Sequence, residues 1–433
     1  MDKLDGLNFA APDFSTFLCS RLAYEEVESP DDPVSRTPFQ RDRDRIIHSR
    51  AFRRLMHKTQ IFNANYGDHY RNRLTHTLEV CQIARSIGKA LRLNDTLIEA
   101  IALAHDLGHT PFGHVGERTL HGIMHGDIKI DGFERANEGF KHNYQALQVI
   151  DNIESERIDE IGMNLSLAVR EGAFKHTDVK IKYNDRKDTV LYSSLDLTNI
   201  YIDKPSFTLE GQVVAIADEI AQCTHDLEDG VRAQVIRIDD ILDNELIQNV
   251  IDESNIDTTR LHCALDVRMS IVKNLVGKLI RNVYNESSDN LINYNDRRKK
   301  EEKDLPEFKN LSDVYDEKLI GFSKDMGEKV EALSALITNC VVKSQLISQS
   351  DAKAEYMITQ LFKAYYKHPK QLPDYILKRY CRKSGRSFSR SLLDDTLLQQ
   401  DQTFIRMICD HIACMTDQYA EREYKKLYLP DYI

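Results

Sequence analysis

Apolar residues recur every three or four positions through most of the chain, a period that predicts amphipathic helices. From Asp42 to Met56 they form one stripe among several arginines, and the same spacing continues from Leu74 to Leu91. Further helices are expected over about residues 97–107, 142–155, 164–174 and 210–228, and from Leu311 to about Lys426. The pattern therefore predicts an all-α fold.

Two segments depart from this period. Between residues 178 and 208 the spacing changes to two, which predicts a small β excursion. The alternating residues there are Val179, Ile181, Tyr183, Val190 and Tyr192. The polar and basic run from Ser287 to Lys303 predicts an exposed connection. We therefore expect a core of residues 1–290, which carries an arginine-rich segment near its start, and a C-terminal helical region of residues 291–433 that packs on it.

Composition adds limits on location and partners. The chain has 433 residues, of which 41% are hydrophobic and 29% charged, as in an ordinary globular protein. No stretch approaches about 18 consecutive apolar residues, so neither a membrane-spanning helix nor a membrane partner is expected. The 8 cysteines are scattered without a C-x-x-C pair, which is typical of reduced thiols, and the start lacks a signal-peptide pattern. A cytoplasmic location is therefore expected.

The charge pattern contains one basic cluster in an acidic chain. A net charge of −11 argues against non-specific binding of nucleic acid, so an anionic substrate would need a local basic site. Two interpretations of the cluster stay open: a solvated helix face paired with Asp42 and Asp44, or a few arginines that point into a phosphate site. Its residues are Arg36, Arg41, Arg43, Arg45, Arg50, Arg53, Arg54 and Lys58, followed by Arg71 and Arg73.

Candidate metal ligands are spread over three predicted helices. The apolar run Leu97–Leu107 contains His105-Asp106 near its end, and a helix end can aim adjacent side chains at one ion. His76 lies on an amphipathic helix, and Asp218 lies among small apolar residues, where a carboxylate is unfavourable unless a cation or donor meets it. Two His and two Asp suit one divalent Mn, Mg, Fe, Co or Zn ion with open ligand positions.

In this order, His76, His105-Asp106 and Asp218 resemble the H…HD…D motif of the HD superfamily of metal-dependent phosphohydrolases. Further segments resemble its deoxynucleoside triphosphate triphosphohydrolase branch, the dGTPase-like proteins, over about residues 35–425. The principal ones are Ser35–Ser49, Lys58–Gln60, Arg73–His76, His105–Glu117, His142–Gln145, Arg170–Gly172, Ala217–Ala221 and His225–Asp229. The resemblance implies an HD-domain helical core within residues 1–290. It also implies hydrolysis of a dNTP, dGTP by default, to deoxynucleoside and tripolyphosphate by attack of water at the α-phosphorus.

The resemblance also assigns roles to single residues. It associates four residues with phosphate contact and with protonation of water or of the leaving group: His114, Glu117, His142 and His109. The segment from His109 to Glu117 is expected to be a loop just beyond the metal. Substrate contacts are expected from Arg73 to phosphate, Gln60 to the sugar 3′-hydroxyl, Lys58 and Arg53 to phosphate or base, and Asp226 to the sugar.

One position departs from the family pattern. Many relatives carry a tyrosine where this chain has Gln222, and that ring packs on the deoxyribose to exclude a 2′-hydroxyl. Gln222 can donate and accept hydrogen bonds but cannot form the same wall. Either Tyr365 or Tyr366 takes over this contact, or the discrimination between sugars is built differently.

Two alternative functions are weighed against this one. Another HD phosphohydrolase would act on an alarmone, a cyclic dinucleotide or a nucleoside monophosphate, but the arginine-rich N-terminal motif and Lys58-Thr59-Gln60 argue against it. A nucleotide-sensing or single-strand DNA-binding assembly would use the HD site structurally, and the intact ligand set argues against that. The resemblance implies a homo-oligomer, a hexamer or tetramer, and leaves open a dNTP effector and single-stranded DNA as partners.

Overall fold

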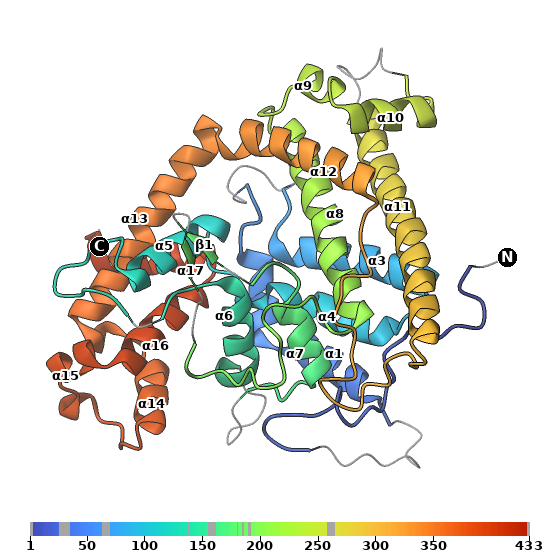
Figure 1. Cartoon of the computed structure of the whole chain (residues 1–433). Coiled ribbons are helices and arrows are strands. Elements are labelled where there is room, and N and C mark those ends of the chain that lie inside the picture. The colour runs from blue at the N-terminus through green and yellow to red at the C-terminus, as the bar shows by residue number, and fades with distance from the viewer. Residues whose placement is uncertain are drawn as a thin grey trace.

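The computed structural model describes residues 3–25, 35–62, 70–136, 138–154, 162–179, 181–183, 186–188, 192–257 and 265–430. The described chain is almost entirely helical, which confirms the predicted all-α class (Figure 1). The core elements are α1 (Pro38–His48), α2 (Arg50–Arg54), α3 (Arg73–Ala90), α4 (Asp95–Ala104), η3 (His105–Gly108), α5 (Gly113–His125), α6 (His142–Gln148), α7 (Leu167–Phe174) and α8 (Leu209–Arg232). The later helices are α9 (Ile238–Leu242), α10 (Glu245–Ser254), α11 (Leu265–Lys300), α12 (Lys324–Ile337), α13 (Gln345–Lys367), α14 (Asp374–Lys383), α15 (Asp395–Gln400), α16 (Gln402–Ala413) and α17 (Asp417–Tyr428).

Helix α4 lies at the centre of the larger hydrophobic cluster, packed against α1, α3, α7 and α8. It is apolar on nearly all sides, as expected for a helix surrounded by others. Polar N-caps fix where the surrounding helices begin: Asn94 accepts from Leu97 N at α4, Asn72 from Thr75 N at α3, and Thr208 from Gly211 N at α8. These starts set which faces of α3, α4 and α8 meet.

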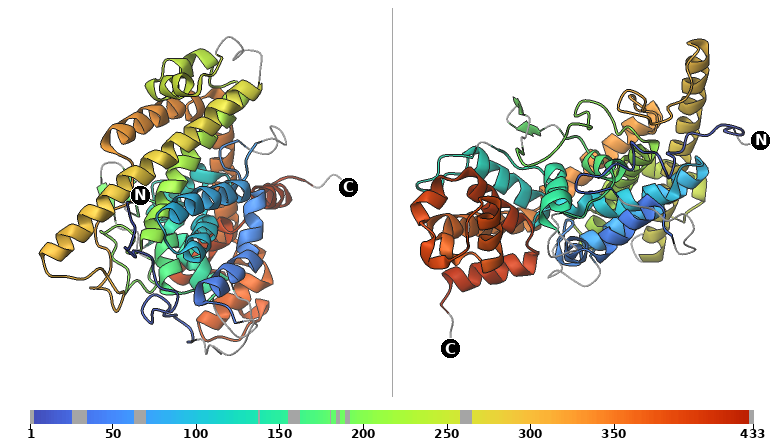
Figure 2. Two further views of the ribbon diagram at one scale, coloured as in Figure 1. Left: turned by 90° about the vertical axis from the view of Figure 1, so that its right-hand side faces the viewer. Right: turned by 90° about the horizontal axis from the view of Figure 1, so that it is seen from below.

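A second hydrophobic cluster joins α5 to the C-terminal helices α13–α17. Its buried aromatic residues include Phe133, Phe362, Tyr365 and Phe404. In the view from below in Figure 2, these C-terminal helices occupy one end of the molecule. Helix α5 therefore connects the two clusters, because it packs against α13 and α16 while its first residues follow η3 along the chain.

The predicted exposed connection from Ser287 to Lys303 is wrong, because α11 continues to Lys300. Leu291 and Tyr294 are buried against the larger cluster at helical spacing, and this apolar contact outweighs the basic run that follows. Figure 2 shows α11 as one long helix across a side of the molecule. Since α11 crosses residue 290 without a break, the division into residues 1–290 and 291–433 stays a proposal.

The predicted β excursion is present as a two-stranded antiparallel ribbon, β1 (Ile181–Tyr183) and β2 (Arg186–Asp188). Its register pairs Ile181 with Asp188 and Tyr183 with Arg186, whereas Val190 lies outside the described residues. Across the described helices, no single one is long and apolar enough to cross a membrane. The helices Lys324–Val341 and Gln345–Lys367 reach the required length and hydropathy only when they are taken together. They are bent by 74° relative to one another, and the criterion considers length and composition alone.

Candidate functional site

The structure brings the four predicted metal ligands together from three helices. His76 comes from α3, His105 and Asp106 from η3 at the end of α4, and Asp218 from α8. His76 Nε2 lies 3.0 Å from Asp218 Oδ1. His105 Nε2 lies 3.4 Å from Asp106 Oδ1 and 3.8 Å from Asp218 Oδ1. All four side chains are buried, so their polar atoms face one another and not solvent.

The change of helix type at the end of α4 places the adjacent pair His105-Asp106. After Ala104 the chain tightens into the 3-10 helix η3, which α3, α6 and α7 surround. Gly108 allows the close approach of α6, since a Cβ there would lie 2.1 Å from the His142 carbonyl oxygen. The sequence prediction that a helix end aims both side chains inward is consistent with this geometry.

The ligand atoms have the chemistry that a divalent ion needs. His105 Nδ1 donates to the Ala102 carbonyl at 2.6 Å, so the neutral ring presents Nε2 as a lone pair. Within the described residues, this buried Nε2 has no hydrogen-bond partner. Burial acts to raise the pKa of Asp106, but the neighbouring His105, His109 and Arg73 hold it well below its usual range. Two buried carboxylates beside a free imidazole nitrogen therefore fit a cation.

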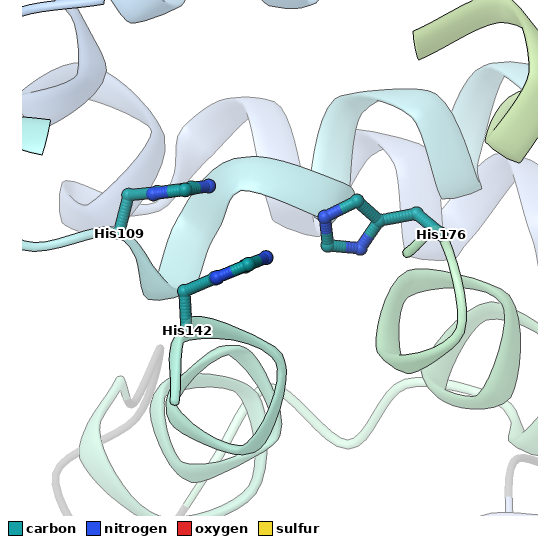
Figure 3. Close-up of side chains that lie close together, drawn as sticks. All are labelled: His109, His142 and His176. Atoms are coloured by element: carbon teal, nitrogen blue, oxygen red, sulfur yellow. The ribbon is translucent and has the colours of Figure 1, made fainter. Parts of the chain in front are cut away.

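A second group of buried imidazoles adjoins this cluster. His109 and His142 stack with ring centroids 4.2 Å apart, and His176 lies beside them (Figure 3). His109 Nε2 lies 3.0 Å from Asp106 Oδ1, and His142 Nδ1 donates to Glu117 Oε2 at 2.8 Å. Burial and the nearby Arg73 keep the pKa of His109 well below its ordinary value. Asp106 thus contacts both groups.

The predicted loop from His109 to Glu117 is only partly a loop. Phe112 and Gly113 adopt left-handed φ values of 61° and 63°, and this turn starts α5 at Gly113. His114 and Glu117 consequently lie three residues apart on the first turn of α5 and share a face. His114 is exposed, whereas Glu117 is partly buried against His142. The helix gives these side chains a firmer support than a loop would.

Among the predicted substrate contacts, Arg73 lies in the site. It is fully buried, and its Nη1 donates to Asp106 Oδ2 at 3.0 Å. Its Nε and Nη2 have no hydrogen-bond partner among the described residues, and Nη2 would lie 3.6 Å from a Cβ at Gly113. Two donors are therefore available beside the first turn of α5, where an anion is favoured. Gln60 is also buried, next to Gly113.

Lys58 and Arg53 are placed differently from what the resemblance implies. Lys58 is buried, and its ammonium group donates to the carbonyl oxygens of His109 and Ala413. Burial lowers the pKa of Lys58 to about 7. Arg53 is exposed and donates to the His48 carbonyl at 2.8 Å. In this structure, Lys58 supports the backbone of the site, and Arg53 does not join the site.

Asp218, Gln222 and Asp226 follow one another at four-residue intervals along α8 and share a face. Gln222 is exposed and lines, with His176 and Asp218, a cleft of about 540 Å³. Asp226 is buried, and burial raises its pKa to about 8. Gln222 therefore faces space that opens directly from the ligand cluster.

Tyr365 and Tyr366 lie in the second hydrophobic cluster, with the Tyr365 hydroxyl 3.3 Å from Glu423 Oε2 and the Tyr366 hydroxyl donating to the Gly132 carbonyl at 2.6 Å. The structure does not bring them to the metal ligands. Their apolar neighbours and buried hydroxyl partners explain this placement better than a sugar contact would. The proposed replacement for the missing tyrosine at position 222 is therefore not assembled here.

Sequence reasoning missed His176, and it placed His225 in a family segment without giving it a role in the site. His225 Nδ1 lies 3.3 Å from His76 Nδ1, and its Nε2 lies 2.9 Å from Glu79, so it orients a candidate ligand. His176 follows the buried helix α7 as His105 follows α4, and each ring bonds to the carbonyl three residues earlier. A histidine just after a buried helix was the signal that could have identified it.

Comparisons with known proteins agree with this geometry. Residues 73–222 match the HD domain, and residues 320–426 match the phosphohydrolase-associated domain. The HD match, over a helical site with clusters that could hold a metal, defines an HD-family hydrolase. Similar proteins named deoxyguanosinetriphosphate triphosphohydrolase-like occur in Geobacter sulfurreducens, 37% identical over 91% of this chain and 89% of the relative, and in Brucella ovis, 36% identical over 98% of each.

A third relative of the same name, from Bartonella tribocorum, is 34% identical over 94% of this chain and 92% of its own. The chain therefore belongs to the deoxyguanosinetriphosphate triphosphohydrolase-like family of HD-domain proteins. The resemblance found in the sequence is confirmed.

Proposed function

We propose that this protein hydrolyses deoxynucleoside triphosphates, with dGTP as the default substrate, to a deoxynucleoside and inorganic tripolyphosphate. The observation that carries the proposal is the convergence of His76, His105, Asp106 and Asp218 directly beside a group of buried histidines. The names of relatives at 34–37% identity over most of the chain support the same substrate class. Phosphoryl transfer needs positioned charge and proton management more than covalent help.

The four residues would hold one divalent ion, with Mn, Mg, Fe, Co and Zn as candidates. Such an ion, when bound, polarises a phosphoryl oxygen and lowers the pKa of water. The protein's contribution is orientation: His225 bonds to His76, and the Ala102 carbonyl bonds to His105. These outer hydrogen bonds fix which ring nitrogen faces the ion.

Arg73 would bind the phosphates through its two available donors, Nε and Nη2. The third nitrogen of the guanidinium, Nη1, donates to Asp106 and so fixes the group in place before substrate binds. A preorganised guanidinium loses little entropy on binding, and its planar fork of N–H donors suits bidentate contact with two phosphate oxygens. Arg73 therefore connects phosphate binding to the carboxylate of the metal site.

Protons would be managed by the histidines on α5 and α6. Glu117 accepts from His142 Nδ1 and so leaves Nε2 of His142 as the acceptor. His114, three residues before Glu117 on α5, would donate a proton to the departing 5′ oxygen of the deoxynucleoside; desolvation lowers its pKa to about 4, and the carboxylate of Glu117 opposes that shift. His109 would remain neutral next to Asp106, in contact with phosphate rather than as an acid.

Product analysis tests the proposal. Purified protein is incubated separately with each dNTP, each NTP, an alarmone and a cyclic dinucleotide in Mg²⁺ or Mn²⁺, and the products are separated by ion-exchange chromatography. Deoxynucleoside and tripolyphosphate are expected. Monophosphate with pyrophosphate, turnover of an alarmone or cyclic dinucleotide instead, or no turnover would reject it. The homo-oligomer, the dNTP effector and the single-stranded DNA partner implied by the resemblance stay predictions.

A further inference from the structure

Six histidines form a continuous row through the site. Ring centroids are 5.7 Å apart for His76 and His105, 5.1 Å for His105 and His176, and 5.3 Å for His176 and His142. The row continues through His109, 4.2 Å from His142, to His114, 5.8 Å from His109. The proposed function uses one end of this row as metal ligands and the other end for phosphate and protons. It gives no role to His176, which lies between them.

Each of three central histidines has one ring nitrogen committed to an acceptor that cannot donate. His109 Nε2 lies 3.0 Å from the Asp106 carboxylate, and His142 Nδ1 lies 2.8 Å from the Glu117 carboxylate. His176 Nδ1 lies 2.7 Å from the Ala173 carbonyl oxygen. These acceptors require an N–H on the committed nitrogen, so a neutral ring presents a lone pair on the other one. Metal-binding histidines are held in this way by carboxylates and carbonyls.

The three rings also converge. One ring nitrogen from each of His109, His142 and His176 lies within 4.8 Å of the other two, and all three side chains are buried. Figure 3 shows the stacked His109 and His142 rings reaching toward His176. In the part of the chain that the structure describes, His109 Nδ1 is buried without a hydrogen-bond partner. A buried polar atom without a partner is unfavourable, and a ligand at this nitrogen would remove that penalty.

The surroundings keep these rings ready to bind a cation. The remaining nitrogen of His142, Nε2, lies 3.3 Å from the Thr177 hydroxyl. That long contact can give way to a stronger ligand. The carboxylates of Asp106 and Glu117 supply negative charge on the far sides of the rings.

We propose that His109, His142 and His176 form a second divalent cation site, adjacent to the His76, His105, Asp106 and Asp218 site and bridged to it by Asp106. Three neutral nitrogen donors select Zn²⁺, Co²⁺ or Ni²⁺ over Mg²⁺. A second cation would add positive charge where the phosphates of the proposed substrate bind. Its role therefore rests on the proposed function, although its existence does not.

Cobalt binding provides the test, because Co²⁺ has visible absorption bands that report on nitrogen ligation. Metal-free full-length protein is titrated with Co²⁺, and the bound ion is counted after gel filtration. We expect two Co²⁺ per chain for the unmodified protein and one for His176→Ala, with loss of one set of absorption bands. Asp218→Asn, which alters the first site only, is also expected to retain one. His125→Ala, at an exposed histidine outside both sites, is expected to retain two.

Several outcomes would overturn the second site. They are a single Co²⁺ in the unmodified protein, or two Co²⁺ in a His176→Ala variant that keeps its helical circular dichroism. His176→Gln, which preserves size and polarity, gives the same reading if the alanine variant does not fold. A single ion that Asp218→Asn releases would leave the first site and the proposed function standing. Absence of any bound Co²⁺ would contradict both.

Discussion

Two regions of this protein bury histidine, and they use it differently. In the site between α3, η3, α6 and α8, each central imidazole bonds to a carboxylate or carbonyl through one nitrogen and turns the other toward its neighbours. In the C-terminal cluster, His411 is just as buried, but it packs against the rings of Tyr365 and Tyr375. Its Nε2 has no hydrogen-bond partner among the described residues. Burial alone therefore does not make a site; convergence of oriented lone pairs and carboxylates does.

The largest effect is expected where the two halves of the site share a residue. Asp106→Ala removes a candidate metal ligand and the partner of both Arg73 and His109. We expect a fall in kcat/KM of about 10³-fold or more, because several kcal/mol of transition-state stabilisation is lost. Steady-state kinetics and metal content measure this. Asp127→Ala, at an exposed aspartate, is the control, and full turnover by the Asp106 variant would disprove the site assignment.

A smaller loss is expected from the hydrogen bond that orients His142. Glu117→Gln keeps the shape of the side chain but removes the charge that accepts from His142 Nδ1. Loss of such an orienting partner lowers activity about 10–100-fold. The acid limb of the pH–rate profile should also shift, which a merely structural role would not produce. Glu134→Gln, on an exposed segment, should leave both the rate and the profile unchanged.

The contact between the C-terminal cluster and the site is expected to affect stability before it affects activity. Asp417, at the start of α17, accepts from the backbone N–H of Thr59 and of Phe112, each at 2.9 Å. Asp417→Ala removes the acceptor of these partly buried donors, so we expect a loss of about 1–3 kcal/mol in the free energy of unfolding. Urea denaturation measures it. Asp374→Ala, which loses only an exposed ion pair with Arg390, should change stability by less than about 1 kcal/mol.

The buried histidine of the C-terminal cluster should make stability depend on pH. Burial lowers the pKa of His411 to about 3, whereas the unfolded chain binds that proton near pH 6.5. Since the unfolded state binds more protons between these values, stability falls as pH falls below about 6.5. At pH 5 this amounts to about 2 kcal/mol relative to pH 7. His411→Leu should remove that part of the dependence in urea titrations at the two pH values; an unchanged difference would contradict the assignment.

The smallest effect concerns the tyrosine that does not reach the site. Tyr365→Phe removes the hydroxyl contact to Glu423, and we expect a loss of about 1 kcal/mol in stability. The ratio of dNTP to NTP turnover should stay unchanged. Gln222→Ala, on the cleft beside Asp218, should alter that ratio instead. The opposite pattern in competition assays would show that Tyr365 contacts the sugar.

The sequence could predict the features that depend on local pattern, but not those that depend on long-range packing. The helices around the site follow from their apolar period, and His76, His105, Asp106 and Asp218 could be identified as one ligand set because their order resembles the H…HD…D motif. Only for Asp218 did the small apolar neighbours add an independent reason. The helical extension of α11 to Lys300 depends on long-range burial of Leu291, which a local basic run conceals. The start of α5 at Gly113 depends on a left-handed turn held from α17, more than 300 residues away. His176 has only a weak local signal, its position just after the buried helix α7, and packing brings it beside His105 and His142.

The oxygen label in the products is the most direct test of the central claim. The protein hydrolyses dGTP in water enriched with ¹⁸O. The deoxynucleoside and the tripolyphosphate are then separated, and their masses are measured by mass spectrometry. Attack at the α-phosphorus predicts one ¹⁸O in the tripolyphosphate and none in the deoxynucleoside. Label in the deoxynucleoside, or release of labelled monophosphate or pyrophosphate in place of tripolyphosphate, would contradict the account.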